Sequence, residues 1–318
     1  MTTENRRARG IAAAVAAGCF WGTTGLFVRA LDGYGYSPLT IVFVRMSLAW
    51  VMIVALFVAT GRTDLFRVRL KDLWCFVGAG VSSSLLLSVF YSISMVLNPV
   101  AVASILLSGS SPIFVIALSA LIFRERITAR KIQALTIVVV GCVLTSGVLG
   151  ASWLFSPKGV AIGLLAGLGS GLYSIMSRFA LNRGYDSRTI NVYSFGIAAL
   201  ACAPFANFPV VAQTVSDAPL KMLAILLAHS LLVSLVPYML FTYALTCVDT
   251  GTAPILASSE PIAALILGLV LYSEVPSLVN LAGMVLVLFG LVVLNVEGGI
   301  ATIFRRIWAM VPKARRHG

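Results

Sequence analysis

A single carboxylate, Glu260, stands inside a run of the sequence from residue 251 to residue 272 that carries no other charge. An ionisable side chain in such apolar surroundings costs about 2.5–3.5 kcal/mol on membrane-insertion scales, so a compensating role is expected. Glu260 could neutralise a cationic substrate or the ammonium of a zwitterion, and it could carry a coupling proton. Its structural alternative is to pair with Arg45, or to cap backbone amides beside Pro261.

A basic side chain, Arg45, lies about six residues into another apolar run. It could bind the carboxylate of a substrate. It could equally extend toward the membrane surface, or pair with Glu260 or Asp32. If Arg45 and Glu260 face one cavity, their charges match the two ends of an amino acid.

Aromatic side chains form a second group of candidates. Rings around a carboxylate can bind a quaternary amine, and each ring face contributes about 0.5–2 kcal/mol by cation–π attraction. The alternative is that these rings fill space between helices or anchor them at the interface. The candidates are Trp21, Tyr91, Tyr173, Tyr238 and Tyr243.

Serines beside two prolines form the third group. Pro112 and Pro261 each lie inside an apolar run, where proline removes a backbone hydrogen bond and frees a carbonyl group. Such a break usually faces protein or a wet cavity. We therefore predict that Ser108, Ser111 and Ser259 line the same pocket. Hydrogen bonds between helices are the alternative role for these serines.

The composition identifies the elements that must hold these residues. The chain has 318 residues, is 59% hydrophobic and 11% charged, and its mean hydropathy is +1.00, which indicates a membrane protein. About 20 apolar residues are needed to cross a bilayer as a helix. We predict an all-α integral membrane protein with ten transmembrane helices, at 10–31, 39–60, 73–97, 99–122, 131–150, 158–181, 189–208, 221–246, 251–272 and 277–296.

The net charge is +12, and its distribution indicates how the chain is oriented in the membrane. Arginine and lysine concentrate in the loops on one side of these predicted helices, and the positive-inside rule then places both termini in the cytoplasm. We expect residues 1–9 to form a basic N-terminus. Residues 297–318 should form a basic amphipathic tail on the inner membrane surface, so the lipid bilayer is the partner and nucleic acid is not.

An internal repeat appears when the chain is shifted by 149 positions. Gly18, for example, then falls on Gly167, and Pro112 falls on Pro261. The halves, 10–150 and 158–296, each contain five predicted helices. Because five is odd, the second half enters the membrane from the opposite side, and the repeats are inverted. Inverted repeats are typical of carriers that work by alternating access.

No cofactor or metal is expected. The five cysteines are scattered and show no Cys/His spacing, and no phosphate-binding loop is found. A membrane enzyme would need a convergent set of His, Asp, Glu and Ser at one depth, which the sequence does not show. A membrane scaffold protein would not need polar side chains lining a site in the middle of the membrane.

Several short motifs, in order, resemble the EamA-type branch of the drug/metabolite transporter superfamily. They are FWG at 20–22, Arg45, FRERIT at 123–128, Glu260-Pro261 and YSE at 272–274. The resemblance covers roughly residues 10–296. It implies a ten-helix secondary carrier with a central pocket between the repeats. Members of that family include exporters of amino acids and, in one branch, a choline importer.

We therefore expect a secondary active transporter in the inner membrane that exports an amino acid or a similar zwitterion. The alternative is a carrier for choline-like or other organic cations that uses Glu260 and an aromatic cage. Either could act as a monomer or a homodimer, and coupling to a proton is open.

Overall fold

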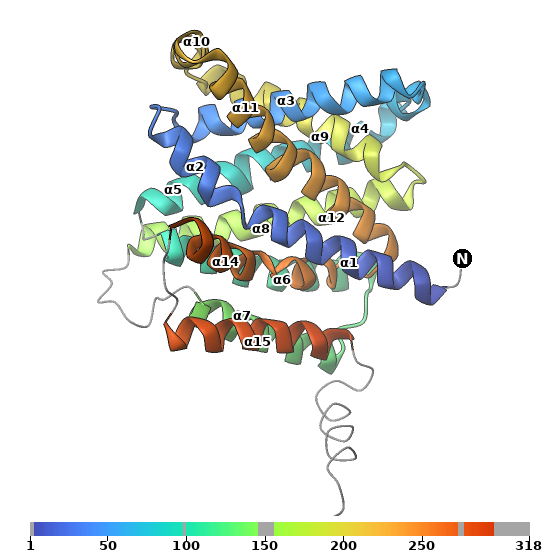
Figure 1. Ribbon diagram of the computed structural model, residues 1–318. Coiled ribbons are helices and arrows are strands. Elements are labelled where there is room, and N and C mark those ends of the chain that lie inside the picture. Colours follow the sequence, from blue (N-terminus) through green and yellow to red (C-terminus); the bar gives the residue numbers. More distant parts are fainter. Residues whose placement is uncertain (1–2, 98–99, 146–155, 273–276, 296–318) are drawn as a thin grey trace, which may run out of the picture.

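The computed structural model describes residues 3–97, 100–145, 156–272 and 277–295, and the regular structure within these ranges is helical (Figure 1). Most helices run alongside one another. The predicted tail at 297–318 lies outside the described residues. The basic residues near the N-terminus form the exposed first turns of a helix.

The first half contains five helical stretches that follow the predicted ranges. Some of these stretches consist of two or three consecutive helical pieces, and short turns connect one stretch to the next. The elements are α1 (Thr3–Trp21) with α2 (Thr24–Asp32), α3 (Pro38–Ala59), the short turns η1 (Thr63–Phe66) and η2 (Leu70–Asp72), α4 (Leu73–Val81) with η3 (Ser82–Val89) and α5 (Phe90–Leu97), α6 (Val100–Phe123), and α7 (Ala129–Thr145).

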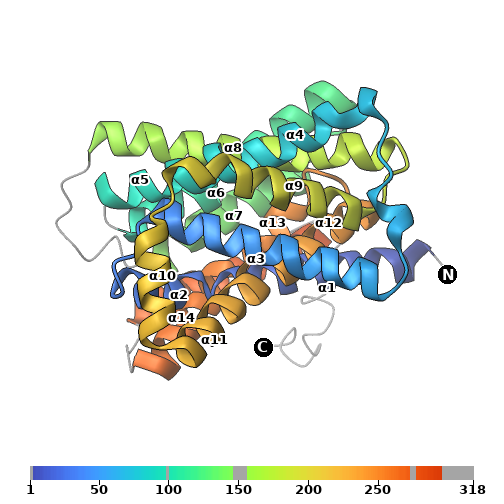
Figure 2. The same ribbon diagram turned by 90° about the horizontal axis from the view of Figure 1, so that it is seen from above.

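The second half repeats this order. Its elements are α8 (Pro157–Asn182), α9 (Ser187–Cys202) with η5 (Ala203–Phe205) and α10 (Phe208–Asp217), α11 (Pro219–His229) with η6 (Ser230–Leu235) and α12 (Val236–Cys247), α13 (Ala253–Ala257) with α14 (Glu260–Tyr272), and α15 (Leu278–Asn295). Figure 2 shows α10 lying across the end of the bundle that is remote from the N-terminus.

Within the described residues, seven helical stretches are long and apolar enough to cross a membrane. An eighth is added if the helices on either side of the 99° bend before α10 form one span. The apolar helix α15 is shorter, and the range predicted for the fifth span, 131–150, lies partly outside the described residues. The multi-pass architecture is therefore confirmed, and the count of ten stays a prediction.

Two π-helical segments interrupt the third and eighth predicted spans. They are η3 (Ser82–Val89) and η6 (Ser230–Leu235), and the offset of 149 carries residue 82 onto residue 231, inside the second segment. π-Helical turns are rare and occur frequently at functional sites. Their recurrence at equivalent places shows that the two halves share this irregularity.

The two halves pack on each other through reciprocal contacts. A Cβ atom on Gly18 of α1 would collide with Ser259, and one on Gly167 of α8 would collide with Ser110. The offset of 149 converts the first pair into the second. Likewise, a Cβ on Gly141 would lie 2.8 Å from Val287, and one on Gly290 would lie 2.7 Å from Val138, where α7 and α15 pack together. In the pair at α7 and α15, and in its counterpart, a glycine of one half packs against a residue of the other half.

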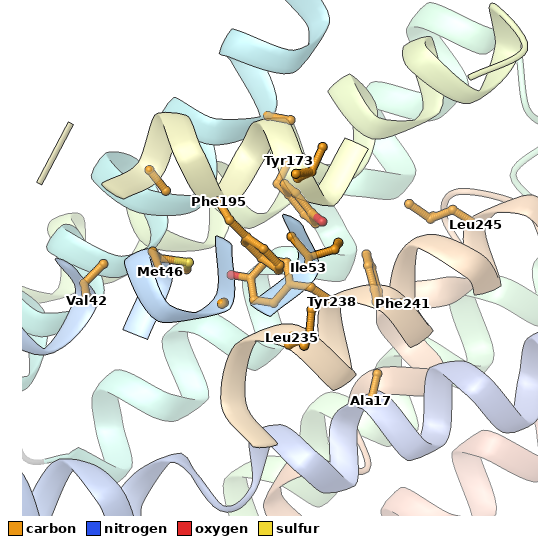
Figure 3. Packing of buried hydrophobic residues seen from close by; sticks show 14 of the residues in the cluster. Ala17, Val42, Met46, Ile53, Tyr173, Phe195, Leu235, Tyr238, Phe241 and Leu245 are labelled. Carbon is orange, nitrogen blue, oxygen red and sulfur yellow. The ribbon is translucent and has the colours of Figure 1, made fainter. Parts of the chain in front are cut away.

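An aromatic cluster lies at the centre of the largest hydrophobic core, between α3, α8, α9 and α12 (Figure 3). Tyr238 is its hub. The ring centroid of Tyr238 lies 5.3 Å from that of Tyr173 and 5.5 Å from that of Phe195, both in edge-on geometry. These contacts fix one wall of the cavity described next.

Candidate substrate-binding cavity

A cavity of about 440 Å³ lies between the two halves. Its walls come from α1, α2, α3, η3, α5, α6, α8, α11, α12, α13 and α14. The cavity extends to the end of α2 and the beginning of α3, at Asp32 and Pro38. Eight of the ten residues predicted from the sequence line it: Trp21, Arg45, Tyr91, Ser108, Ser111, Tyr173, Tyr238 and Glu260.

Two predicted residues lie elsewhere. Ser259 is buried against α1, where its hydroxyl donates a hydrogen bond to the carbonyl oxygen of Val15 at 2.8 Å. Tyr243 is 38% exposed on α12 and is not among the lining residues. Ser259 therefore has a packing role in this structure, and Tyr243 lies on another face of its helix.

Arg45 occupies the wall formed by α3 and η3. Its side chain is only 8% exposed, so it does not extend to the membrane surface. The guanidinium Nη2 donates to the hydroxyl of Ser88 at 3.2 Å, and Nε is buried without a partner in the described part of the chain. A buried guanidinium without a counter-charge is costly, so this wall presents unsatisfied positive charge to the cavity.

Glu260 occupies a different wall, at the first residue of α14. The backbone of α14 at Glu260 packs against Gly22, which directly follows α1. Among the described residues, Arg45 forms no ion pair with Glu260 or Asp32. The two opposite charges therefore face one cavity without neutralising each other.

Aromatic residues form another part of the cavity wall. The ring centroid of Trp21 lies 5.5 Å from that of Tyr238 and 5.5 Å from that of Phe241. The hydroxyl of Tyr173 donates to Asn191 at 3.2 Å, so this hydroxyl is directed into the protein. Trp21 and Tyr238 thus offer apolar surface to a ligand, while Tyr173 supports them from behind.

Serines join the helices at the base of the cavity. The hydroxyl of Ser111 on α6 donates to that of Ser170 on α8 at 2.7 Å. Both residues line the cavity. Ser111 therefore combines the two roles considered for it, because it holds two helices together and contributes polar surface.

Some lining residues were not predicted from the sequence. His229 lies alone in its apolar run, and Ser88 follows other serines in a run without proline, so neither stood out. The polar residues missed are Thr24, Arg29, Asp32, Ser83, Ser88, Ser170 and His229, and Ser258, beside the predicted Ser259 and Glu260, also lines the cavity. The only available signal was the polar character of single positions within predicted spans.

The opposite end of the cavity is closed by polar contacts between the two halves. Glu125, between α6 and α7, accepts hydrogen bonds from the backbone N–H groups of Thr250 at 3.1 Å and Gly251 at 3.4 Å. Lys131 is 4% exposed, and its ammonium lies 3.7 Å from Glu125 and 3.1 Å from Asp249. These contacts fasten the loop before α13 to the loop before α7.

Comparisons with known proteins agree with this architecture. The model of the EamA-like transporter family matches residues 8–147 and 157–296. An uncharacterized transporter of Archaeoglobus fulgidus is 26% identical over 291 residues, which are 89% of this chain and 95% of the relative. A probable terminal-alkyne amino-acid exporter of Streptantibioticus cattleyicolor is 25% identical over 285 residues, covering 90% and 91%. A solved crystal structure covers 95% of this chain and 99% of its own, with a TM-score of 0.73 at 17% identity.

Proposed function

Because the chain belongs to the EamA-like transporter family, we propose that it is a secondary transporter that exports an amino acid or a similar zwitterion across the cytoplasmic membrane. One observation carries this proposal. Arg45 and Glu260 bring opposite charges to two walls of one cavity, and they do not pair with each other. An amino acid carries the complementary pair of charges. The name of the Streptantibioticus relative supports the same substrate class.

The direction of opening fits an alternating-access cycle. The cavity reaches Asp32 and Pro38, at the ends of α2 and α3 remote from the N-terminus. If the N-terminus is cytoplasmic, as the loop charges favour, this state faces outward. The contacts of Glu125 and Lys131 then close the cytoplasmic side. The reciprocal packing of the two halves supports inverted repeats that exchange these roles.

Coupling of substrate transport to proton movement requires an ionisable group whose protonation depends on whether substrate is bound. Glu260 meets this need because it lies in the cavity wall without a described partner. In our proposal its carboxylate binds the ammonium group of the substrate in one state and a proton in the other. The chain then needs no ATP.

A second candidate function is favoured by the aromatic wall. Trp21 and Tyr238 line the same cavity as Glu260, and aromatic faces with a carboxylate bind quaternary amines. A choline-like cation would use this wall and leave Arg45 without a role. Arg45 therefore distinguishes the two candidates.

Exchange measurements in proteoliposomes test the proposal. Vesicles loaded with unlabelled amino acids or choline would be supplied with the labelled compound, for the wild type, Glu260→Gln, Arg45→Gln and the exposed control Arg62→Gln. We expect amino-acid exchange in the wild type and the control, and a loss of at least about tenfold in the other two variants. Choline exchange that survives Arg45→Gln would favour the cation carrier. If the wild type exchanges neither class, the proposal is wrong.

A further inference from the structure

The histidine in the cavity wall has no partner for either ring nitrogen in the part of the chain that the structure describes. His229, the last residue of α11, is 0% exposed, and neither Nδ1 nor Nε2 forms a hydrogen bond in the described residues. A buried polar group without a partner is costly to the folded state. Since His229 borders the cavity, its ring nitrogens are candidates for contact with a bound molecule.

The imidazole has a defined orientation. Its ring stacks on Phe27 of α2, with centroids 5.2 Å apart and an interplanar angle of 25°. His229 directly precedes the π-helical segment η6, where a wider turn changes the direction in which side chains point. The fold therefore holds this ring in place without using its nitrogens.

Arg45 and His229 line the same cavity, and α3, which carries Arg45, packs against α11 and η6 on either side of the bond after His229. Nε of Arg45 is also buried without a described partner. Ser88 accepts from Arg45 and donates to the carbonyl oxygen of Ser83 at 2.9 Å, so it positions the guanidinium. Unused N–H groups from α3 and α11 thus gather in one part of the cavity.

We propose that Arg45 and His229 form a carboxylate-binding subsite, with Ser88 as a positioning residue, so that every good substrate carries a carboxylate group. This inference rests on the proposed function and narrows it. One carboxylate oxygen accepts from the guanidinium of Arg45, and the other accepts the N–H of the neutral imidazole. Hydrogen bonds to an ionised acceptor are the stronger kind. No bond is broken and no proton is transferred.

The subsite predicts discrimination that Glu260 alone does not provide. An amine that lacks the carboxylate can still bind at Glu260, but it leaves Nε of Arg45 and both ring nitrogens of His229 without partners. A site built for a polar group rejects the analogue that lacks the group, because its own buried polar atoms stay unpaired. Amino acids should therefore bind much more tightly than the amines formed from them by decarboxylation.

Ligand-induced thermal shifts of the full chain in detergent test this inference. The ligand pairs are leucine with isopentylamine, phenylalanine with phenethylamine, and lysine with cadaverine, and acetate and benzoate serve as simple carboxylates. The variants are His229→Phe, which keeps an aromatic ring against Phe27 but removes both nitrogens, and His229→Gln, which restores a donor. Ser234→Ala is the control, since its buried hydroxyl also lacks a partner among the described residues but does not line the cavity.

We expect His229→Phe to raise the dissociation constant of the amino acid by about tenfold or more and to leave that of the amine unchanged. His229→Gln should recover part of the affinity, and Ser234→Ala should match the wild type. Equal losses for amino acid and amine, or no loss, would overturn the inference; if His229→Phe does not fold, the same criteria apply to His229→Leu, which also removes both nitrogens. If the wild type binds simple carboxylates through His229 but no amino acid, the subsite stands and the proposed substrate is wrong. If it binds no carboxylate at all, the subsite is wrong.

Discussion

Ser259 lies directly against Gly18, in the space that any larger side chain at position 18 would need. The contact joins α1 of the first half to the ninth span of the second half. Its counterpart, Gly167 against Ser110, joins α8 to α6. Small residues at such crossings allow helices to approach closely, and in lipid this close packing drives helix association.

Alanine at either glycine should therefore destabilise the protein. Gly18→Ala and Gly167→Ala should each lower the free energy of unfolding by about 1–3 kcal/mol, because a buried methyl group has no space. Thermal unfolding in detergent measures this. Gly25→Ala is the matched control: a Cβ there meets nothing within 4 Å, so it should be neutral or slightly stabilising. Similar unfolding temperatures for all three variants would contradict the tight crossings.

Loss of the buried lysine should loosen the closed end of the cavity. Lys131→Met removes the contacts with Glu125 and Asp249, and a loss of about 1 kcal/mol corresponds to about a fivefold change in the open population. A cysteine replacing Ser119, which is buried near Gly251, reports opening through its rate of thiol labelling. The background must lack the five native cysteines.

Labelling of Ser119→Cys should be several-fold faster with Lys131→Met than without it. Arg62→Met is the control, because it removes an exposed salt bridge to Asp64, outside the closing contacts. Equal labelling rates in all three backgrounds would show that Lys131 does not hold this end closed.

Replacement of the cavity tryptophan should weaken the binding of ligands that carry an amine. Trp21→Phe keeps an aromatic ring against Tyr238 but weakens any cation–π contribution, so we expect a two- to fivefold rise in dissociation constant, from about 0.5–1 kcal/mol. It should also abolish the change in tryptophan fluorescence on ligand binding. Trp50→Phe, on an exposed part of α3, should preserve both signals. A fluorescence change that survives in Trp21→Phe would place the reporter elsewhere.

Asp186 caps the N-terminus of α9, and its carboxylate should make the stability of the protein fall at acid pH. The hydrogen bond from the Arg188 side chain lowers the pKa of the Asp186 carboxyl, and the carboxylate also accepts the backbone N–H of Arg188 at 2.8 Å. A lowered pKa in the folded state stabilises the protein above the unfolded pKa of about 3.9, and this contribution disappears as the pH falls through the folded value.

Asp186→Ala should cost about 1 kcal/mol at neutral pH because the cap is lost. Asp186→Asn should cost less, since the amide oxygen still caps the helix, and should remove the part of the acid dependence that belongs to this carboxyl. Unfolding temperatures measured between pH 3 and pH 7 test both variants. An unchanged acid dependence in Asp186→Asn would contradict the assignment.

Hydropathy predicted the helices well because apolar side chains must face lipid or protein along the whole length of a span. The sequence also identified eight lining residues, since polar and aromatic groups inside a span seldom face lipid. It did not resolve which face of a helix each residue occupies. Ser259 differs from Glu260 by one position, or about 100° of rotation, and Tyr243 lies about 140° from Tyr238.

Other features depend on three-dimensional contacts that no local pattern reveals. The π-helical segment at Ser82–Val89 contains no proline or other breaker, so its sequence predicts an ordinary helix. The unpaired state of Arg45 and the place of His229 beside it follow only from how α3 packs against η6. A lone histidine in an apolar run gave no indication of a neighbour 184 positions earlier in the chain.

The reciprocal packing of the two halves has a thermodynamic consequence. If the halves rock, each crossing that opens on one side is replaced by a nearly identical crossing that closes on the other, so packing alone gives the two end states similar free energies. A preference for either state must then come from positions where the halves differ. Lys131 corresponds to Asn280, and Ser111 corresponds to Glu260. In such a cycle, unmatched polar residues of this kind would set the resting state, and exchanging them between the halves should reverse it.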